Sequence, residues 1–537
     1  MKQAVIDMRH QQGDLRLDAE VVVVGSGAAG AVIATELAQA GVDVVILEEG
    51  KYLAPETYGR MRPSEAMRHL WRDGGMTMAA GLGDSPSINL TMGRAIGGSS
   101  LATGGVCFRT PEHVLQRWVE EHGLGELSPK QMEPFFERVE QSLKVSRVPD
   151  SQRSRSTTLF GEGLQQAHGA RLDPVYRNMS GCKGRSRCNF GCPEGAKLST
   201  DISYLPRAVR DGARIYAGCL VERVLTRGQR AAGVEGRLLN GRHGRPAGRL
   251  QVHARYVVMA AGAVHTPLVL MRSRIGRRSR MVGKNLTLHP SMRIFARFDQ
   301  EVRGWEGALQ SAYSDAFKDE GITLMSVFVP PGVFGAAMPG VGPEHHARAA
   351  HVPHLAMFGA LVHDEGGGRI RRTPGREPIV TYRMHPEDRS RLPRAMRLLG
   401  EAYFAAGAKE LFFPILGLQP VDADAFRKLD LERIHGRRIE CASQHPLGSC
   451  RMGSAPDHSV VDPDGQSWEL SHLYVADSSI IPSSLGVNPQ VTVMAMATRI
   501  AWKLAERIRP IRRSLRTVAE TPADVGMAAV ANQNVMN

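Results

Sequence analysis

The sequence predicts an α/β protein with two parts, a domain built on a βαβ unit and a second domain in which an antiparallel sheet is backed by helices. The first part is indicated by a glycine-rich turn between two apolar runs near the N-terminus. The second is indicated by four strand-like runs, separated by Gly/Pro loops, between residues 291 and 384. A length of 537 residues is enough for about two to four domains.

Composition narrows the class of protein. Hydrophobic residues make up 42% of the chain and charged residues 23%, as in ordinary globular proteins. The formal net charge is +14, with basic clusters at 272–284 and 503–516. We assign these clusters to solvated surface, with an anionic membrane surface or an acidic partner as the alternative. No module typical of nucleic-acid binding is present, so we expect no nucleic-acid partner.

The N-terminal residues and the cysteine content indicate the cellular compartment of the protein. Residues 1–20 are polar and contain no apolar segment of a secretory signal, and no run of about 18 apolar residues suggests a membrane span. The seven cysteines are an odd number, which argues against a disulfide framework. We therefore expect a cytoplasmic protein, with peripheral membrane association as the alternative.

A βαβ unit begins the first domain. Ala19–Val24 is an apolar run typical of a strand, Ala28–Ala40 has the composition of a helix that ends at Gly41, and Val42–Leu47 is a second strand. A strand, a glycine turn, a helix and a strand within about 30 residues form the first unit of a Rossmann-type domain.

The turn inside this unit has the pattern G-x-G-x-x-G. Gly25 permits a tight turn, Gly27 lets the backbone approach a pyrophosphate, and Gly30 lets the helix pack on the strand. The helix begins at Ala28 and Ala29, whose N–H groups are free to bind phosphate. Glu48 ends the second strand, where a carboxylate accepts hydrogen bonds from ribose hydroxyls. The pattern predicts a bound dinucleotide but does not distinguish FAD from NAD.

The remaining elements predict a discontinuous first domain. Tyr256–Ala260 is a short strand, and residues 440–510 again read as strand, turn and helix. Between them, Pro386–Gly407 is a predicted helix with an apolar stripe. The strands expected for the second sheet are Met292–Phe298, Ile322–Val329, His354–His363 and Pro378–Met384. We assign residues 15–140, 200–290 and 436–510 to the dinucleotide-binding domain, 141–199 to a cysteine-containing excursion, 291–435 to the substrate domain, and 511–537 to a mobile tail.

Four segments resemble the glucose–methanol–choline (GMC) oxidoreductases, a family that binds FAD. They are the βαβ unit ending at Gly50, Gly93–Ser100, Ala260–Pro267, and the stretch Ser443–Gly453 followed by Val475–Pro482 and Asn488-Pro489. One position departs from the family, because Thr103 stands where an Asn is common, and its hydroxyl has a shorter reach. The resemblance implies FAD as cofactor, held by Gly25, Gly27, Ala28, Ala29, Gly30, Glu48, Arg94, Gly97, Gly98, Ser99, Thr103, Val221, Ala261, Asp477 and Pro489.

The resemblance also implies a catalytic pair. His445 matches the position of the base that takes the hydroxyl proton of an alcohol, and an ordinary pKa near 6.5 suits that role. Asn488 matches the position whose amide N–H holds the substrate oxygen as negative charge develops. The implied activity is oxidation of an alcohol to the carbonyl by hydride transfer to flavin N5.

The substrate is expected to be an apolar alcohol, with either a long chain or a ring. Trp71–Thr77 and Cys107–Pro111 resemble the long-chain alcohol oxidase branch of the family, and the nearest alternative is a sugar or polyol dehydrogenase. A lyase or a photochemical enzyme of the same fold is a further alternative. Apolar residues of the second sheet are candidates for the substrate wall, although such residues also build cores: Phe328, Val329, Val333, Phe334, Met338, Met357 and Phe358.

Three cysteines have the spacing C-x₅-C-x₃-C, with Pro193 directly after the last. Cys182, Cys188 and Cys192 resemble the cysteines that hold a three-iron, four-sulfur cluster in FAD-dependent sugar dehydrogenases. A loop of packed or paired thiols is the alternative. A cluster would imply a cytochrome or quinone as electron acceptor, and without it the acceptor is either oxygen or an electron carrier.

Overall fold

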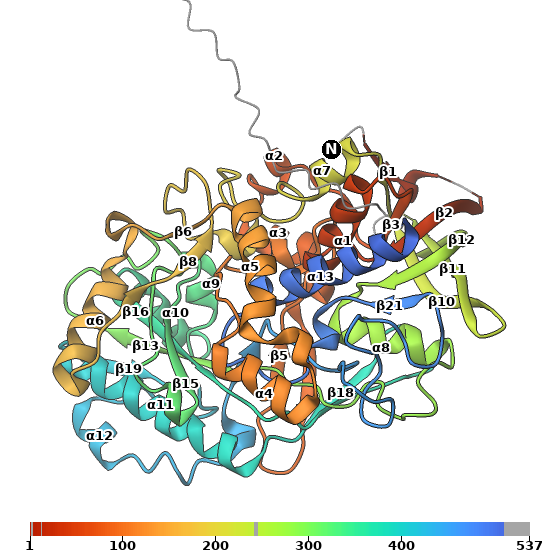
Figure 1. Cartoon of the computed structure of the whole chain (residues 1–537). Coiled ribbons are helices and arrows are strands. Elements are labelled where there is room, and N and C mark those ends of the chain that lie inside the picture. The colour runs from red at the N-terminus through yellow and green to blue at the C-terminus, as the bar shows by residue number, and fades with distance from the viewer. Residues whose placement is uncertain (2–3, 12, 241–244, 510–537) are drawn as a thin grey trace, which may run out of the picture.

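Two β-sheets organise the computed structural model, which describes residues 1, 4–11, 13–240 and 245–509 (Figure 1). The α/β fold class is confirmed. The tail expected at 511–537 lies outside the described residues. Within these residues, none of the helices combines the length and apolar character that a bilayer crossing needs.

The first sheet has the strand order β1-β9-β3-β2-β12-β11-β10, with β21 paired to β12. Its strands are β1 (Val5–Asp7), β2 (Leu15–Val24), β3 (Val44–Glu48), β9 (Arg214–Ala217), β10 (Cys219–Arg227), β11 (Arg230–Asn240), β12 (Arg245–Met259) and β21 (Leu473–Val475). Strands β3, β2, β12 and β21 are parallel neighbours. Their carboxyl ends therefore meet at one edge, where ligands of such sheets bind.

The buried runs explain why these strands lie in the middle of the sheet. Val21, Val22 and Val23 have no exposed surface, and β3 is buried along its whole length. A continuous run of β-branched residues is typical of a parallel strand that is covered on both faces. The helices α1 (Ala28–Gln39) and α13 (Gln490–Ile508) lie side by side although they come from opposite ends of the chain (Figure 1).

The second sheet has the order β17-β18-β4-β5-β20-β13-β16-β15-β14-β7, with β19 paired to β13. Its strands are β4 (Thr77–Gly81), β5 (Ile88–Leu90), β7 (Asp173–Pro174), β13 (Ser291–Arg297), β14 (Ala312–Ser314), β15 (Ile322–Ser326), β16 (Leu355–Val362), β17 (Gly368–Arg371), β18 (Ile379–Tyr382), β19 (Glu410–Phe412) and β20 (Cys441–Ser443). A separate antiparallel pair is formed by β6 (Val145–Arg147) and β8 (Tyr176–Asn178).

Helices α6 (Arg155–His168) and α11 (Pro386–Ala405) pack against β16 of this second sheet. The ring of Phe160 stacks on that of Phe358, with 3.8 Å between the centroids, and Tyr403 meets Phe160 edge-on. The other helices are α2 (Pro55–Tyr58), α3 (Pro63–Leu70), α4 (Glu112–His122), α5 (Pro129–Leu143), α7 (Leu205–Arg210), α8 (Gly262–Arg272), α9 (Pro331–Ala336), α10 (Pro343–Ala350) and α12 (Ala423–Lys428).

The second sheet differs from the expectation in one respect. It is mainly antiparallel, but β4 is parallel to β18 and β5 is parallel to β20. These pairs arise because residues 77–90 and 441–443 join the sheet from outside the range 291–435. The domain boundaries that we expect from the sequence stay a prediction.

Most predicted elements are present with small shifts of their ends. The predicted strand at 322–329 ends at Ser326, and the helix α9 begins shortly after it, with Pro330 as its N-cap. The strand expected at 256–260 is the last part of β12, which begins at Arg245 and pairs antiparallel with β11 along its first residues. The predicted helix at 386–407 ends two residues earlier, at Ala405.

We predict that two glycines of the first turn respond differently to alanine. A Cβ at Gly30 would lie 1.9 Å from the Gly25 carbonyl oxygen, whereas a Cβ at Gly27 would lie 3.8 Å from its nearest neighbour, the Gly98 Cα. Gly30→Ala should lower the free energy of unfolding by about 1–3 kcal/mol, as overpacking usually does. Gly27→Ala is the matched control, with a change within about 0.5 kcal/mol. Denaturant titration of ligand-stripped protein measures both, and equal midpoints would contradict the packing argument.

Candidate active site

The turn after β2 presents the N-terminus of α1 to a cavity. Gly25 has a φ of +105°, and a Cβ there would lie 2.3 Å from the Ala260 carbonyl oxygen. Gly27 is the N-cap of α1 and has no side chain to cap the first N–H groups. These N–H groups of Ala28 and Ala29 therefore face the cavity uncapped, as an anion site requires.

Glu48 holds this turn from the end of β3. One carboxylate oxygen accepts hydrogen bonds from the Ser26 N–H (3.0 Å) and hydroxyl (2.7 Å), and the other accepts from the Gly50 N–H (2.8 Å). Glu48 also lines the cavity. Its carboxylate therefore orders the glycine turn, a role that the sequence did not indicate.

A second glycine turn, residues 93–103, meets the first one backbone to backbone. A Cβ at Gly98 would lie 2.7 Å from the Gly27 Cα, so the contact requires glycine. The Gly97 N–H donates to the Ser26 hydroxyl (3.0 Å), and the Ser99 hydroxyl accepts from the Gly93 N–H (3.0 Å). Thr103 lies at the end of this turn and lines the same cavity.

Asp477 joins two other segments at the carboxyl edge of the sheet. Its carboxylate accepts hydrogen bonds from the Gly262 N–H (2.9 Å), the Ser479 N–H (2.8 Å) and the Thr266 hydroxyl. Gly262 is the first residue of α8, so Asp477 fixes the start of that helix. Burial raises the pKa of Asp477, and three donors satisfy its oxygens.

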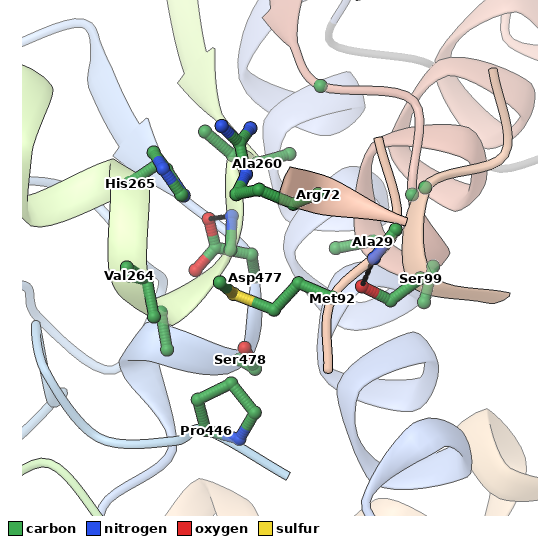
Figure 2. Close-up of a pocket in the computed structure, with 18 of the residues that line it drawn as sticks. Ala29, Arg72, Met92, Ser99, Ala260, Val264, His265, Pro446, Asp477 and Ser478 are labelled. Carbon is green, nitrogen blue, oxygen red and sulfur yellow. Dashed lines mark hydrogen bonds between the residues drawn. The ribbon is translucent and has the colours of Figure 1, made fainter. Parts of the chain in front are cut away.

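One cavity brings most of the predicted residues together (Figure 2). Figure 2 shows Ala29 and Ser99 on one side of it and Asp477, Val264 and His265 on the other. Gly30, Arg94 and Gly97 are not among the residues that line it. The predicted residues that do line it are Gly25, Gly27, Ala28, Ala29, Glu48, Gly98, Ser99, Thr103, Val221, Ala261, His445, Asp477, Asn488 and Pro489.

His445 and Asn488 form a direct pair in this cavity. The Asn488 Nδ2 lies 3.0 Å from the His445 Nε2, although the two residues belong to different loops. His445 follows β20 and its N–H donates to the Ser443 hydroxyl (3.0 Å), whereas Asn488 directly precedes Pro489, the N-cap of α13. The His445 Nδ1 and the Asn488 Oδ1 are buried without a protein partner. These two atoms therefore have hydrogen-bonding capacity that the protein itself does not use.

Burial lowers the pKa of His445 to about 4. A neutral imidazole is consequently present at neutral pH and has an unprotonated nitrogen. That state is the one in which a histidine can accept a proton.

A charged cluster that the sequence did not indicate borders the cavity. Arg72 is buried and forms ion pairs with Glu49 and with Glu377 (3.1 Å), and Glu377 lies 3.0 Å from the His265 Nε2. Burial, followed by the charge of Arg72, lowers the pKa of His265 to about 4. No sequence spacing links residues 49, 72, 265 and 377, so only the fold reveals this cluster.

The apolar residues expected for the substrate wall do not line this cavity. Phe328 and Phe334 stack with 4.8 Å between their centroids, and both are buried in a separate apolar cluster with Met338 and Met357. The expectation that they form the substrate wall is therefore corrected. They are core residues, because Phe328, Phe334 and Met357 are almost completely buried.

The cysteine loop does not have the arrangement of a cluster site. Among the described residues, no group of three His, Cys, Asp or Glu side chains could hold a metal ion. The buried Cys188 sulfur accepts a hydrogen bond from the Arg177 guanidinium (2.9 Å). Cys182 and Cys192 are partly exposed, and all seven cysteines are free thiols. The expected iron–sulfur cluster finds no support here, and the alternative of a disulfide is also absent.

Comparison with known proteins identifies relatives along most of the chain. Residues 19–291 and 366–497 match the N-terminal and C-terminal models of the GMC oxidoreductases. An uncharacterised GMC-type oxidoreductase of Mycobacterium tuberculosis is 38% identical over 92% of this chain and 77% of its own. A long-chain-alcohol oxidase of Arabidopsis thaliana is 29% identical over 94% of this chain and 70% of its own.

Solved structures share the fold at low sequence identity. Pyridoxine 4-oxidase from Mesorbium loti has a TM-score of 0.66 at 19% identity, covering 90% of this chain and 99% of its own. A variant of the formate oxidase of Aspergillus oryzae has a TM-score of 0.70 at 16% identity, covering 92% of this chain and 99% of its own.

The low pKa of His445 predicts a loss of stability in acid. The unfolded histidine takes up a proton near pH 6.5, whereas the folded one resists protonation down to about pH 4. This contribution to stability is complete above pH 6.5 and is lost as the pH falls from 6.5 towards 4. Between pH 7 and pH 5, His445→Gln should therefore lose about 1 kcal/mol less unfolding free energy than the wild type. This figure is below the full value for such a pKa shift, because the side chain borders an open cavity. The exposed His458→Gln is the control, and identical pH dependence in both variants would contradict the prediction.

Proposed function

The chain belongs to the GMC oxidoreductase family, and on this premise we propose that it binds FAD and oxidises an alcohol to the carbonyl compound by hydride transfer. The observation that carries the proposal is the His445–Asn488 pair, which lies in the same cavity as the two glycine turns. A dinucleotide site and a base with an amide neighbour therefore share one space. That combination is what alcohol oxidation by a flavin needs.

The residues present fit FAD. The uncapped N-terminus of α1 suits the pyrophosphate, and the glycine contact at Gly27 and Gly98 leaves room for it. Glu48 has further lone pairs for ribose hydroxyls, and Val221 and Asp477 line the same cavity. When bound, FAD supplies an acceptor for a hydride.

His445 is proposed to take the hydroxyl proton of the substrate. Its neutral imidazole has no protein partner at Nδ1 and only Asn488 at Nε2. Asn488 would hold the substrate oxygen through its amide N–H as negative charge develops there. The protein residues thus move the proton and fix the oxygen, which leaves the carbon-bound hydrogen to depart as hydride.

An apolar primary alcohol is the proposed substrate. The likeness to long-chain-alcohol oxidases supports it, as do apolar residues that line the same cavity, which include Val106, Val264 and Val493. A sugar or polyol dehydrogenase is the second candidate. It is less favoured because the cysteine loop that suggested it has no cluster geometry. Electrons are proposed to pass from the flavin to oxygen, with an electron carrier such as a cytochrome or quinone as the alternative.

The proposal predicts that His445→Gln retains FAD but loses reduction of the flavin by alcohols. Removing a positioned base usually slows the reaction by about 10²–10⁴-fold. Stopped-flow bleaching of the flavin under anaerobic conditions measures this step without involving the acceptor. His458→Gln serves as the control because its side chain is exposed on the surface. Unchanged bleaching in His445→Gln, or folded protein that carries no FAD, would refute the proposal.

The substrate class predicts a dependence on chain length. Each additional buried CH₂ of a primary alcohol should raise kcat/KM by about fourfold, from about 0.8 kcal/mol of transfer free energy, until the cavity is filled. An alcohol panel assayed in parallel with oxygen and with an artificial acceptor tests both substrate and acceptor. Faster turnover of free sugars than of every aliphatic alcohol would favour the second candidate.

A further inference from the structure

We infer that His289 is a positioning residue that holds the loop carrying Asn488, an inference that rests on the proposed function. His289 is fully buried and does not line the cavity. Its ring lies edge-on to that of His445, with 5.4 Å between the centroids. It is therefore close to the catalytic pair without being open to substrate.

The ring of His289 binds the backbone just before Asn488. Its Nε2 lies 3.0 Å from the Leu485 nitrogen and 3.2 Å from the Gly486 nitrogen, and both N–H groups donate to it. Asn488 follows only two residues later. A single ring nitrogen consequently determines where this loop can place the amide of Asn488.

These two hydrogen bonds determine the tautomer of His289. A nitrogen that accepts two N–H groups carries no proton, so the proton of the neutral ring lies on Nδ1. That Nδ1 is buried and has no protein partner. Burial, followed by the nearby His445 and His363, lowers the pKa of His289 well below its ordinary value. The His289 Nε2 therefore stays an unprotonated acceptor at neutral pH.

Asp364 ties His289 and the same loop together from the other side. One carboxylate oxygen accepts a hydrogen bond from the backbone N–H of His289 (3.0 Å) and another from the Ser484 hydroxyl (3.2 Å). The other accepts from the Leu288 N–H (2.9 Å) and the Tyr382 hydroxyl (2.8 Å). The carboxylate thus fixes both the strand entry that carries His289 and the loop that carries Asn488.

The backbone of His289 has a conformation that histidine rarely adopts. Its φ is +48°, in the left-handed region that residues other than glycine rarely adopt. The hydrogen bonds to Asp364 hold that conformation, and it directs the ring at residues 485 and 486. Strain that the surroundings maintain in this way is common beside active sites.

The test compares two substitutions of similar size at position 289. In His289→Gln, the side-chain oxygen can accept from the two N–H groups, whereas His289→Leu has no acceptor. In His289→Leu, the amides of residues 485 and 486 should exchange hydrogen about tenfold faster, and alcohol should reduce the flavin about 10–100-fold more slowly. His289→Gln should stay within about threefold of the wild type in both measurements, and FAD content should be unchanged in both variants.

A double-mutant cycle with Asn488→Ala separates positioning from general stability. If His289 acts through Asn488, then His289→Leu has little further effect on flavin reduction once Asn488 is gone. Additive losses, or a His289→Gln variant as slow as His289→Leu, would overturn the inference. Exchange that is unchanged in His289→Leu would overturn it as well. If no alcohol reduces the wild-type flavin, the proposed function fails, whereas the exchange comparison still decides whether His289 anchors the loop.

Discussion

The contact between two glycine turns is the constraint on which the rest of the site depends. Gly27 and Gly98 touch backbone to backbone, and a methyl group at Gly98 would overlap the Gly27 Cα. The contact joins the end of β2 to the segment after β5, and so joins the first sheet to the second. The cavity exists because these two turns meet there without side chains between them.

Three buried carboxylates hold other segments around the site together through hydrogen bonds. Glu48 orders the first turn, Asp477 fixes the start of α8, and Asp364 holds the segments of His289 and Ser484. Each accepts at least three hydrogen bonds, and two of these come from backbone N–H groups. Such donors satisfy a buried carboxylate without a charged partner.

The sequence was most informative where the physical signal is local. The βαβ unit and its glycines depend on neighbouring residues, and the structure has β2, α1 and β3 at the predicted places. The entry of residues 77–90 into the second sheet could not be predicted, because pairing between distant strands leaves no local pattern. The same limit applies to the site. The resemblance indicated His445 and Asn488, but only the fold shows that Arg72, Glu377 and His265 form one cluster. The apolar run around Phe328 and Phe334 was ambiguous for another reason, since core and pocket residues have the same composition.

The pairing of α1 with α13 has a consequence for biosynthesis. Strand β21 and helix α13, which packs against α1, come from residues 473–508, whereas β2 and α1 lie within residues 15–39. During translation, the face of α1 that packs against α13 therefore stays uncovered until residues 490–508 have been made. Contacts of such long sequence separation slow folding and expose apolar surface in the meantime. In a domain that is continuous in sequence, the corresponding helix would be covered much earlier in synthesis.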